Sequence, residues 1–295
     1  MIQQSLAEGH FGKVAIIGVG LIGGSVGLAL RNMRLTTEIV GIGRDLSRLG
    51  RAEQLGAIDR STTVVAEGVA DADLVLLCTT VGHIVTELQN VLALATPNAL
   101  VTDVGSTKTT IVEASHDDHR FVGGHPMAGS ERGGVDAANP KLFNGATWAI
   151  TPHHGNSPAT IDRLTELAES LGANSLLLTP EDHDAMVALT SHLPHVIAAC
   201  VMRQASHSIT THPEIQRLAA GSFADATRVA ASPAAIWRDV CLTNRSAILH
   251  TITAFRRQLG TLAAAIESAD SEEIEKFFRE SQEAKASWPV VTPKA

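Results

Sequence analysis

The pattern of hydrophobic positions along the chain changes near residue 180. Before it, short continuous apolar runs alternate with amphipathic stretches. The runs predict strands at residues 13–17, 38–42, 73–78, 99–104, 147–151 and 175–178, and the stretches between them predict helices at 21–31, 83–94 and 159–171, with a polar helix ending near Leu55. Continuous apolar strands separated by helices are typical of a parallel sheet covered on both faces. We therefore predict a doubly wound, Rossmann-type α/β domain over residues 12–179.

Beyond residue 180 the strand-like runs give way to long alanine-rich amphipathic stretches. One helix is predicted to begin at Ser232-Pro233 and to run past Leu262. Asp270 and Glu273 form a capping box that opens another, ending near residue 286. We predict an all-helical domain over residues 180–290. Long helices rich in Ala, Ile and Leu often pack against a partner subunit, so a homodimer is expected, with packing inside one chain as the alternative.

Composition narrows the possible partners. The chain of 295 residues has a net charge of −8 and 23 Lys and Arg residues, with no basic run longer than Arg256-Arg257. A nucleic-acid partner would require a basic patch, whereas a small anionic molecule requires only a few local arginines. We see no apolar run of the ~20 residues that span a membrane and no signal peptide. Three widely spaced cysteines suit reduced thiols, and we expect a cytoplasmic protein.

A glycine-rich segment, GVGLIG at residues 18–23, follows the first predicted strand and opens the first predicted helix. In this position G-x-G-x-x-G predicts a dinucleotide site, because the glycines permit a tight turn and the helix start attracts a pyrophosphate. The alternative is a glycine-rich turn without a ligand. The residues predicted to bind the cofactor here are Gly18, Gly20, Leu21, Ile22 and Gly23.

The end of the second predicted strand bears on the choice of cofactor. An acidic residue there would bind the ribose 2′-hydroxyl of NAD, whereas an arginine would accommodate the 2′-phosphate of NADP. Gly43 occupies the expected acidic position and Arg44 follows it. This favours NADP bound by Arg44. NAD remains possible, because Asp45 would supply the acid if the strand ended later than predicted.

The segment GGHPMAGSE at residues 123–131 places one histidine between glycines and a proline. We predict a loop here, neither helix nor ordinary strand. Histidine titrates near neutral pH, so a positioned His125 could accept or donate a proton, although a surface turn with an incidental histidine is the alternative.

Five ordered motifs resemble the prephenate/arogenate dehydrogenase family of tyrosine biosynthesis. They are GVGLIGG at 18–24, DVGSTK at 103–108, HPMAGSE at 125–131, SHLPH at 191–195, and GSFADATR at 221–228 with Trp237. The resemblance covers residues 12 to 290. It implies a dinucleotide domain, a helical dimerisation domain, and the oxidative decarboxylation of a cyclohexadienyl alcohol with hydride transfer to a nicotinamide.

The resemblance also implies roles for single residues. His125 corresponds to the family histidine that takes the hydrogen bond of the substrate hydroxyl, and Ser106 to the serine that helps to orient it. Arg228 occupies the family's carboxylate-binding position, and His195 resembles a second substrate-binding histidine. A guanidinium matches a carboxylate bidentately. The alternative for Arg228 is an ion pair with Asp225 at i, i+3.

Sequence spacing gives one further expectation about His195. Asp184, Ala188, Ser191 and His195 form a 4-3-4 series on one helical stripe, which places Ser191 beside His195 in the substrate site. Pro194 should disturb this helix near Thr190 and open room for a ligand.

His192 points away from that stripe and is predicted to be structural. A zinc site formed by His183, His192 and His195 is an alternative, but residues with these spacings on one helix do not converge well, and we predict no metal.

Substrate choice is less determined by sequence. Prephenate is the first choice, and arogenate, whose ammonium group would favour an acidic neighbour, is the alternative. Ser130 and Glu131 are predicted to contact the substrate side chain. Two other functions remain open. One is a β-hydroxyacid or imine reductase, which would require a lysine on the helical domain, where residues 180–280 offer only Lys276. The other is a non-catalytic NADP-binding redox sensor.

Overall fold

The structure is a computed structural model that describes residues 11–129 and 132–288. It forms two compact units, Met1–Arg245 and Ser246–Ala295. The predicted substrate contacts Ser130 and Glu131 lie outside the described residues. The predicted domains, 12–179 and 180–290, stay a prediction, since the division into compact units falls at a different residue.

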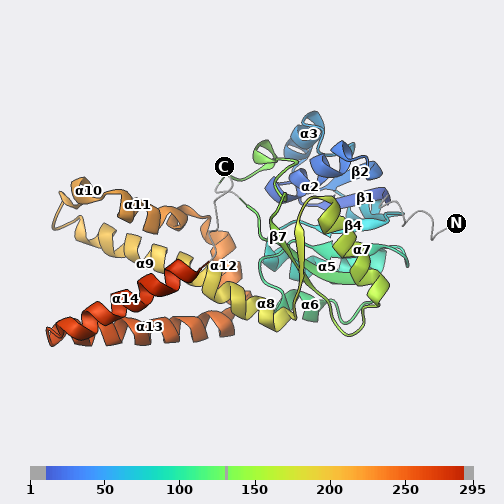
Figure 1. Cartoon of the computed structure of the whole chain (residues 1–295). Helices are drawn as coiled ribbons and strands as arrows, with labels where there is room; N and C mark the ends of the chain where they lie inside the picture. The colour runs from blue at the N-terminus through green and yellow to red at the C-terminus, as the bar shows by residue number, and fades with distance from the viewer. Residues whose placement is uncertain (1–10, 130–131, 289–295) are drawn as a thin grey trace. The chain divides into compact units, whose positions relative to one another are not determined.

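An eight-stranded sheet with the order β3-β2-β1-β4-β5-β6-β7-β8 forms the centre of the first unit (Figure 1). Its strands are β1 (Phe11–Ile17), β2 (Thr36–Ile42), β3 (Arg60–Thr62), β4 (Leu74–Leu77), β5 (Leu100–Asp103), β6 (Phe121–Pro126), β7 (Thr147–Thr151) and β8 (Asn174–Leu177). Neighbouring strands are parallel except at the β6–β7 pair, which is antiparallel. The prediction of a mostly parallel sheet is confirmed, and the antiparallel pair is a correction. The segment between β6 and β7 has no crossover α-helix among its described residues, so the chain returns in the opposite direction.

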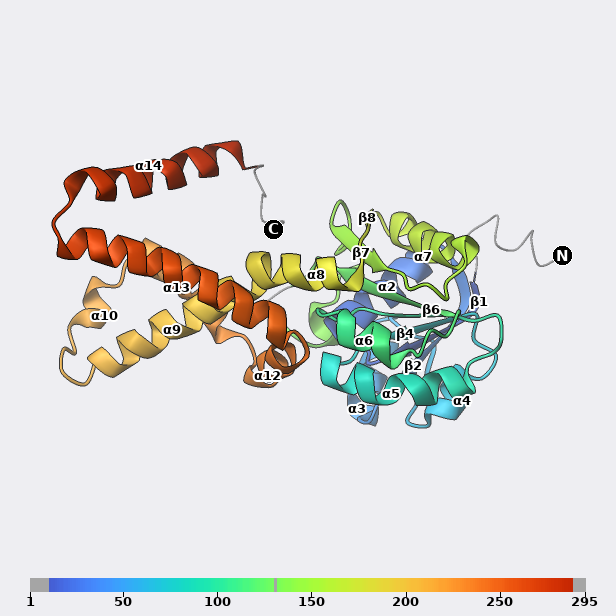
Figure 2. The ribbon, with the colours of Figure 1, turned by 90° about the horizontal axis from the view of Figure 1, so that it is seen from below.

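Helices cover both faces of this sheet (Figure 2). They are α2 (Leu21–Asn32), α3 (Leu46–Gln54), α4 (Val65–Val69), α5 (Val81–Leu94), α6 (Thr109–Ala114) and α7 (Pro158–Ser170). Alternate residues of β1 serve the two faces: Val14 and Ile16 pack in the core beneath α2 and α7, whereas Ala15 and Ile17 pack in the core beneath α5. Both cores are apolar, which explains why the strands read as continuous hydrophobic runs. The predicted doubly wound domain is confirmed.

His125 lies in a strand, and the predicted loop at residues 123–126 is wrong. Gly124 pairs with Ile150 and His125 pairs with Ala149. A Cβ on Gly124 would lie 2.7 Å from the carbonyl oxygen of Asp103, and one on Gly123 would lie 2.4 Å from Thr151 Oγ1. The two glycines are therefore required by close packing between strands, which a sequence pattern of turn-forming residues cannot distinguish from a loop.

The remainder of the first unit is helical. Its elements are α8 (Pro180–Val187), the π-helix η2 (Ala188–His192), α9 (Leu193–Ser208), α10 (Ile215–Leu218), α11 (Gly221–Thr227), the 3-10 helix η3 (Arg228–Ala231) and α12 (Ala234–Thr243). The π-helix lies where Pro194 was predicted to disturb the helix, so that disturbance is confirmed. Pro194 has no N–H to donate to Thr190, and a wider turn accommodates the missing bond.

The helical run Pro180–Ser208 is long and apolar enough to cross a membrane by length and composition alone. The prediction that no run reaches this length is therefore wrong. Such a run is weak evidence for a membrane, because core helices of soluble proteins pass the same test. Two polar side chains near its start, His183 and Asp184, are buried against the sheet domain.

The predicted single helix from Ser232 past Leu262 is interrupted. α12 ends at Thr243, Asn244 adopts φ −113° and ψ 36°, and α13 (Arg245–Glu267) follows. The Asn244 side chain bonds to Asp184 and His192, partners that sequence spacing does not reveal. The predicted capping box is confirmed: the Asp270 carboxylate accepts the backbone N–H of Glu273, 3.0 Å away, and α14 (Ser271–Ser287) begins there.

Candidate active site

The Gly18 loop joins the end of β1 to the start of α2. Gly18 has φ +94°, and a Cβ there would lie 2.9 Å from the Cys78 backbone at the end of β4. A Cβ on Gly23 would lie 2.4 Å from the Gly18 carbonyl oxygen, so this loop folds only with glycine at both positions. A Cβ on Gly20, in contrast, would meet nothing within 4 Å. Leu21 and Ile22, the predicted partners of the cofactor, form the first turn of α2.

The start of α2 fits a bound pyrophosphate. Its first turn contains no acidic residue, and the side chain of no described residue caps it. The first backbone N–H groups of a helix carry partial positive charge and lack partners within the helix, so an anion is favoured there. The open space beside Gly20 allows a phosphate to approach the backbone closely.

The end of β2 carries the predicted determinant of cofactor choice. β2 ends at Ile42, so Gly43 is the first residue beyond it, and Arg44 is exposed. Asp45 caps α3, because its carboxylate accepts the backbone N–H groups of Ser47 at 2.9 Å and Arg48 at 3.3 Å. Hydrogen bonds from Ser47 and Arg48 lower the pKa of Asp45. The acid that would suit NAD is thus engaged in a helix cap, and the residue directly after the strand has no side chain.

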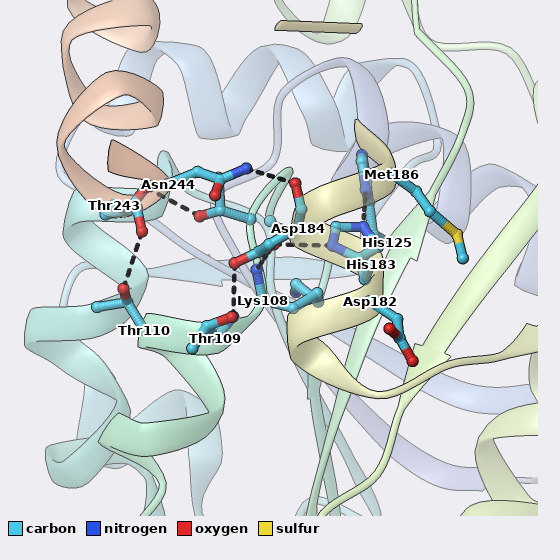
Figure 3. Close-up of polar contacts among 12 residues, drawn as sticks. Lys108, Thr109, Thr110, His125, Asp182, His183, Asp184, Met186, Thr243 and Asn244 are labelled. Atoms are coloured by element: carbon cyan, nitrogen blue, oxygen red, sulfur yellow. Dashed lines mark hydrogen bonds and ion pairs between the residues drawn. The ribbon is translucent and has the colours of Figure 1, made fainter. Parts of the chain in front are cut away.

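A chain of hydrogen bonds leads from His125 to the start of α6 (Figure 3). His125 Nδ1 lies 2.8 Å from His183 Nε2, and His183 Nδ1 lies 2.9 Å from Asp184 Oδ1. Asp184 also accepts two backbone N–H groups, from Lys108 at 2.7 Å and from Thr109 at 3.0 Å. α8 is therefore connected directly to the end of β6 and to the start of α6.

A buried ion pair holds the backbone next to His125. Lys108 and Asp103 have side chains that are 0% exposed, and Lys108 Nζ donates to Asp103 Oδ2. Lys108 Nζ also donates to the Gly124 carbonyl oxygen at 2.7 Å, while Asp103 Oδ1 accepts the Gly124 N–H at 3.1 Å. Both polar groups of Gly124 are thus satisfied by one ion pair, which fixes the end of β6. Burial lowers the pKa of Lys108, and Asp103 partly offsets this.

The surroundings of His125 favour its neutral form. Its pKa is held well below the ordinary histidine value, first by burial and then by His183 and the positive charge of Lys108. Burial also acts on Asp184 and would raise its pKa, but the hydrogen bonds from His183, Thr109 and Lys108 lower it instead. His125 is thus a neutral imidazole that is linked through His183 to the ionised carboxylate of Asp184. Such an imidazole can accept a proton at neutral pH.

His195 stacks on Trp237, with ring centroids 4.0 Å apart and an interplanar angle of 29°. Its Nδ1 donates to the Ser191 carbonyl oxygen at 2.9 Å, which leaves Nε2 as the acceptor of the neutral ring. Burial and the nearby positive charge of Arg228 lower the pKa of His195. Ser191 contributes its carbonyl here, and its hydroxyl makes no hydrogen bond to any described residue.

Arg228 begins η3, which follows α11, and it is exposed. No ion pair joins Arg228 to Asp225 in the described part of the chain, so that alternative reading of the arginine gains no support. Ser106 lies in the loop after β5, partly buried, and its hydroxyl has no hydrogen-bond partner among residues 11–129 and 132–288. Its orienting role stays a prediction.

His192 faces the interior of the unit. Its Nδ1 lies 3.2 Å from Asn244 Nδ2, and the same Asn244 nitrogen donates to the Asp184 carbonyl oxygen at 2.8 Å. The His192 ring meets Trp237 edge-on, with centroids 5.9 Å apart. Burial lowers the pKa of His192 to about 4. His125, His183 and Asp184 together are called the His125 relay. Asn244, His192 and Trp237 connect this relay to His195.

Sequence reasoning missed the most consequential partners of His125. His183 was considered only as a zinc ligand, and Lys108 only as part of a motif. The adjacent pair His183-Asp184 was a usable signal, because a carboxylate beside a histidine is a common orienting arrangement. Asn244 offered none, since its two partners are 60 and 52 residues away. No group of three or more His, Cys, Asp or Glu residues suited to a metal occurs among the residues described.

Comparison with known proteins agrees with this geometry. Residues 26–177 match the model of the prephenate dehydrogenase nucleotide-binding domain, and residues 179–280 match that of the prephenate dehydrogenase dimerization domain. The second match supports homodimer formation. The first match begins beyond the Gly18 loop, so the dinucleotide assignment of that loop rests on its own geometry.

Several relatives are similar over most of the chain. A prephenate dehydrogenase of Bacillus subtilis is 33% identical, over 94% of this chain and 76% of the relative, and a cyclohexadienyl dehydrogenase of Zymomonas mobilis is 34% identical, over 93% and 95%. A crystal structure of prephenate dehydrogenase from A. aeolicus, in complex with hydroxyphenyl propionate and NAD+, has a TM-score of 0.84 at 28% identity, covering 93% of this chain and 97% of that one. The Synechocystis arogenate dehydrogenase structure has a TM-score of 0.81 at 28% identity, covering 94% and 100%. The chain therefore belongs to the prephenate dehydrogenase family.

Proposed function

We propose that this protein oxidatively decarboxylates prephenate to 4-hydroxyphenylpyruvate with NADP+ as the hydride acceptor, in tyrosine biosynthesis. The observation that carries the proposal is the state of His125: its Nδ1 is engaged by His183, and its Nε2 has no hydrogen-bond partner among the described residues. Family membership supplies the reaction class. The conversion of arogenate to tyrosine is the second candidate, because a relative by structure is named arogenate dehydrogenase.

In the proposed reaction His125 acts as the base. A nicotinamide held at the Gly18 loop would supply the acceptor for the hydride of the hydroxyl-bearing carbon, and carbon dioxide would leave as the ring becomes aromatic. The hydroxyl proton grows more acidic as the hydride departs, so a hydrogen-bonded acceptor lowers the barrier. His125 Nε2 accepts that proton, and its lowered pKa keeps it available as an acceptor at neutral pH. Ser106, next to this end of the sheet, is proposed to help orient the reacting groups.

The substrate is proposed to bind through cations and neutral acceptors on the helical elements. Arg228 is exposed and unpaired with Asp225, so its guanidinium is available for a substrate carboxylate. His195 presents Nε2 as an acceptor beside the Trp237 ring, and Ser191 lies on the preceding turn. Ser130 and Glu131 are proposed to meet the substrate side chain.

NADP is proposed as the preferred cofactor. Arg44 is exposed beyond β2, and the nearest acid, Asp45, caps α3. The A. aeolicus relative was solved with NAD+, so NAD is the alternative. An Arg44→Ser variant should weaken NADP+ binding by about tenfold and leave NAD+ binding unchanged. The ratio of the two dissociation constants, measured by fluorescence titration, checks this. An unchanged ratio would assign cofactor choice to another residue.

Initial rates test the reaction as a whole. Four pairings are needed, of prephenate or arogenate with NAD+ or NADP+, and we expect the highest kcat/KM with prephenate and NADP+. A higher value with arogenate would reverse the substrate assignment. Turnover with none of the four would contradict the proposal and favour the non-catalytic sensor. The reductase alternative has little support, because its only candidate lysine, Lys276, is paired on the surface of α14 with Glu273 at 3.2 Å.

We also propose a cytoplasmic homodimer assembled through the C-terminal helices. α14 has no buried residue within its unit, and large apolar side chains are exposed on both helices, among them Leu249, Leu259, Ile266 and Phe278. Exposed apolar surface of this kind marks interaction sites. Light scattering of the purified chain should give twice the 31.0 kDa monomer mass. A monomer at micromolar concentration would contradict the dimer.

A further inference from the structure

The protons of the His125 relay are constrained from its far end. The Asp184 carboxylate accepts hydrogen bonds from three donors: the His183 ring and the backbone N–H groups of Lys108 and Thr109. It also lies in the electrostatic field of the Lys108 ammonium. An ionised carboxylate can only accept hydrogen bonds. His183 Nδ1, 2.9 Å from Asp184 Oδ1, must therefore carry a proton.

This assignment propagates to His125. A neutral imidazole with a proton on Nδ1 has only a lone pair on Nε2. His183 Nε2 lies 2.8 Å from His125 Nδ1, and two lone pairs cannot form that contact, so His125 Nδ1 must supply the proton. Neutral His125 then has its lone pair on Nε2, the nitrogen without a protein partner among the described residues.

We propose that His183 and Asp184 are positioning residues that hold His125 in its Nδ1–H tautomer, so that Nε2 is the proton acceptor before substrate arrives. The proposal rests on the proposed function, in which His125 is the base. His183 is 1% exposed and Asp184 is 4% exposed, and neither is placed to meet the substrate. Their proposed effect on the reaction is exerted through His125.

The remaining charged and titratable groups around the relay are consistent with hydrogen bonds that run from His125 to His183 and from His183 to Asp184. Lys108 and Asp103 form their own buried pair, and the backbone N–H of Lys108 lies at the carboxylate end, where it stabilises the ionised form of Asp184. His192 is turned to Asn244, whose amide donates to the Asp184 carbonyl oxygen rather than to the carboxylate. Asp184 is thus held by donors only, which leaves His183 no acceptor role toward it.

The tautomer can be measured directly in the full-length wild-type protein. Nitrogen-15 NMR of uniformly labelled protein at pH 8 distinguishes protonated from unprotonated ring nitrogens, and a His125→Asn variant identifies the His125 signals by their loss. We expect a protonated Nδ1 and an unprotonated Nε2. A protonated Nε2 in the wild-type protein would overturn the proposal without any substituted relay residue having to fold.

Variants of the relay then separate positioning from simple structural support. Asp184→Asn introduces an NH2 group that can donate to His183 and reverse the tautomer, and kcat should fall by about 100-fold or more, with KM and cofactor affinity within about threefold. Asp182→Asn changes an exposed aspartate two residues earlier in α8, so it is the matched control and should leave kcat unchanged. Equal kcat in both variants would overturn the proposal.

His183 offers a test by conservative replacement. Glutamine can donate to Asp184 with its amide N–H and accept from His125 with its carbonyl, whereas leucine can do neither. We expect His183→Gln to keep kcat within about tenfold of wild type and His183→Leu to lose at least 100-fold. Equal losses in the two variants would contradict a tautomer role. Absence of turnover in the wild-type enzyme would refute the proposed function, whereas the NMR result would still decide the tautomer.

Discussion

The Gly18 loop and the His125 relay lie at the same edge of the sheet, where the parallel strands β1 and β6 end, yet they are built by opposite means. The loop works through missing side chains: Gly18 and Gly23 make room for backbone, and Gly20 leaves open space for a ligand. The relay works through buried polar side chains: His183 and Asp184, and Lys108 beside them, are each almost fully enclosed.

This difference determines how each region responds to change. In the loop a substitution acts by adding atoms, so its effect depends on what the new atoms meet. In the relay a substitution removes one partner and leaves another buried group unsatisfied, which is costly in a low-dielectric interior. Substitutions in the relay should therefore have larger effects on activity and stability than substitutions in the loop.

The largest expected effect is on His125 itself. His125→Asn should lower kcat by about 1,000-fold, because the proton acceptor is lost, while cofactor affinity stays within about twofold. Steady-state kinetics and cofactor titration measure the two quantities separately. His207→Asn, exposed near the end of α9, is the control and should be unaffected. Unchanged turnover in His125→Asn would remove the basis of the proposed mechanism.

Breaking the buried ion pair should affect stability almost as strongly. Lys108→Met leaves the Asp103 carboxylate buried without its counter-ion, at a cost of about 3–5 kcal/mol in the free energy of unfolding. Chemical denaturation measures this loss. Lys141→Met, which alters an exposed lysine, should change the free energy by less than about 0.5 kcal/mol. A small effect of Lys108→Met would show that the protein interior tolerates Asp103 as an unpaired carboxylate.

The pH dependence of stability reports on the same region through His192. Its pKa is about 4 in the folded protein, against an ordinary value of 6.5, so the unfolded chain binds a proton in this window and the folded chain does not. Stability should therefore fall as the pH drops from 6.5 to 4, by about 3 kcal/mol from this group. Denaturation curves at several pH values, compared between wild type and His192→Asn, should show a weaker pH dependence in the variant. Parallel curves would exclude His192 as the cause.

The smallest expected effect belongs to the loop. Gly20→Ala places a methyl group in open space, so the free energy of unfolding should not fall, but cofactor affinity should fall by about tenfold as the methyl group obstructs the pyrophosphate. Gly50→Ala in α3 also meets nothing within 4 Å and is the control, with unchanged affinity. Equal affinities in both variants would place the cofactor elsewhere.

Much of the fold could be predicted because local pattern and tertiary structure agree there. Strands β1, β2, β4, β5, β7 and β8 were predicted to within two residues, since each is an apolar run with a clear boundary. β3 and β6 were missed: β3 has three residues, and the glycines of β6 resemble a turn. The break between α12 and α13 was missed because Asn244 is satisfied by partners distant in sequence.

The candidate site divides in the same way. From sequence alone, the glycine loop is recognisable by its residue order after a strand, and the candidate base His125 and the candidate carboxylate-binding Arg228 are predicted from the resemblance to the family. Only the tertiary structure decided what surrounds His125. The partners His183, Asp184 and Lys108 lie 58, 59 and 17 residues away in the chain, and a hydrogen bond depends on distance and angle in space, which no sequence spacing encodes.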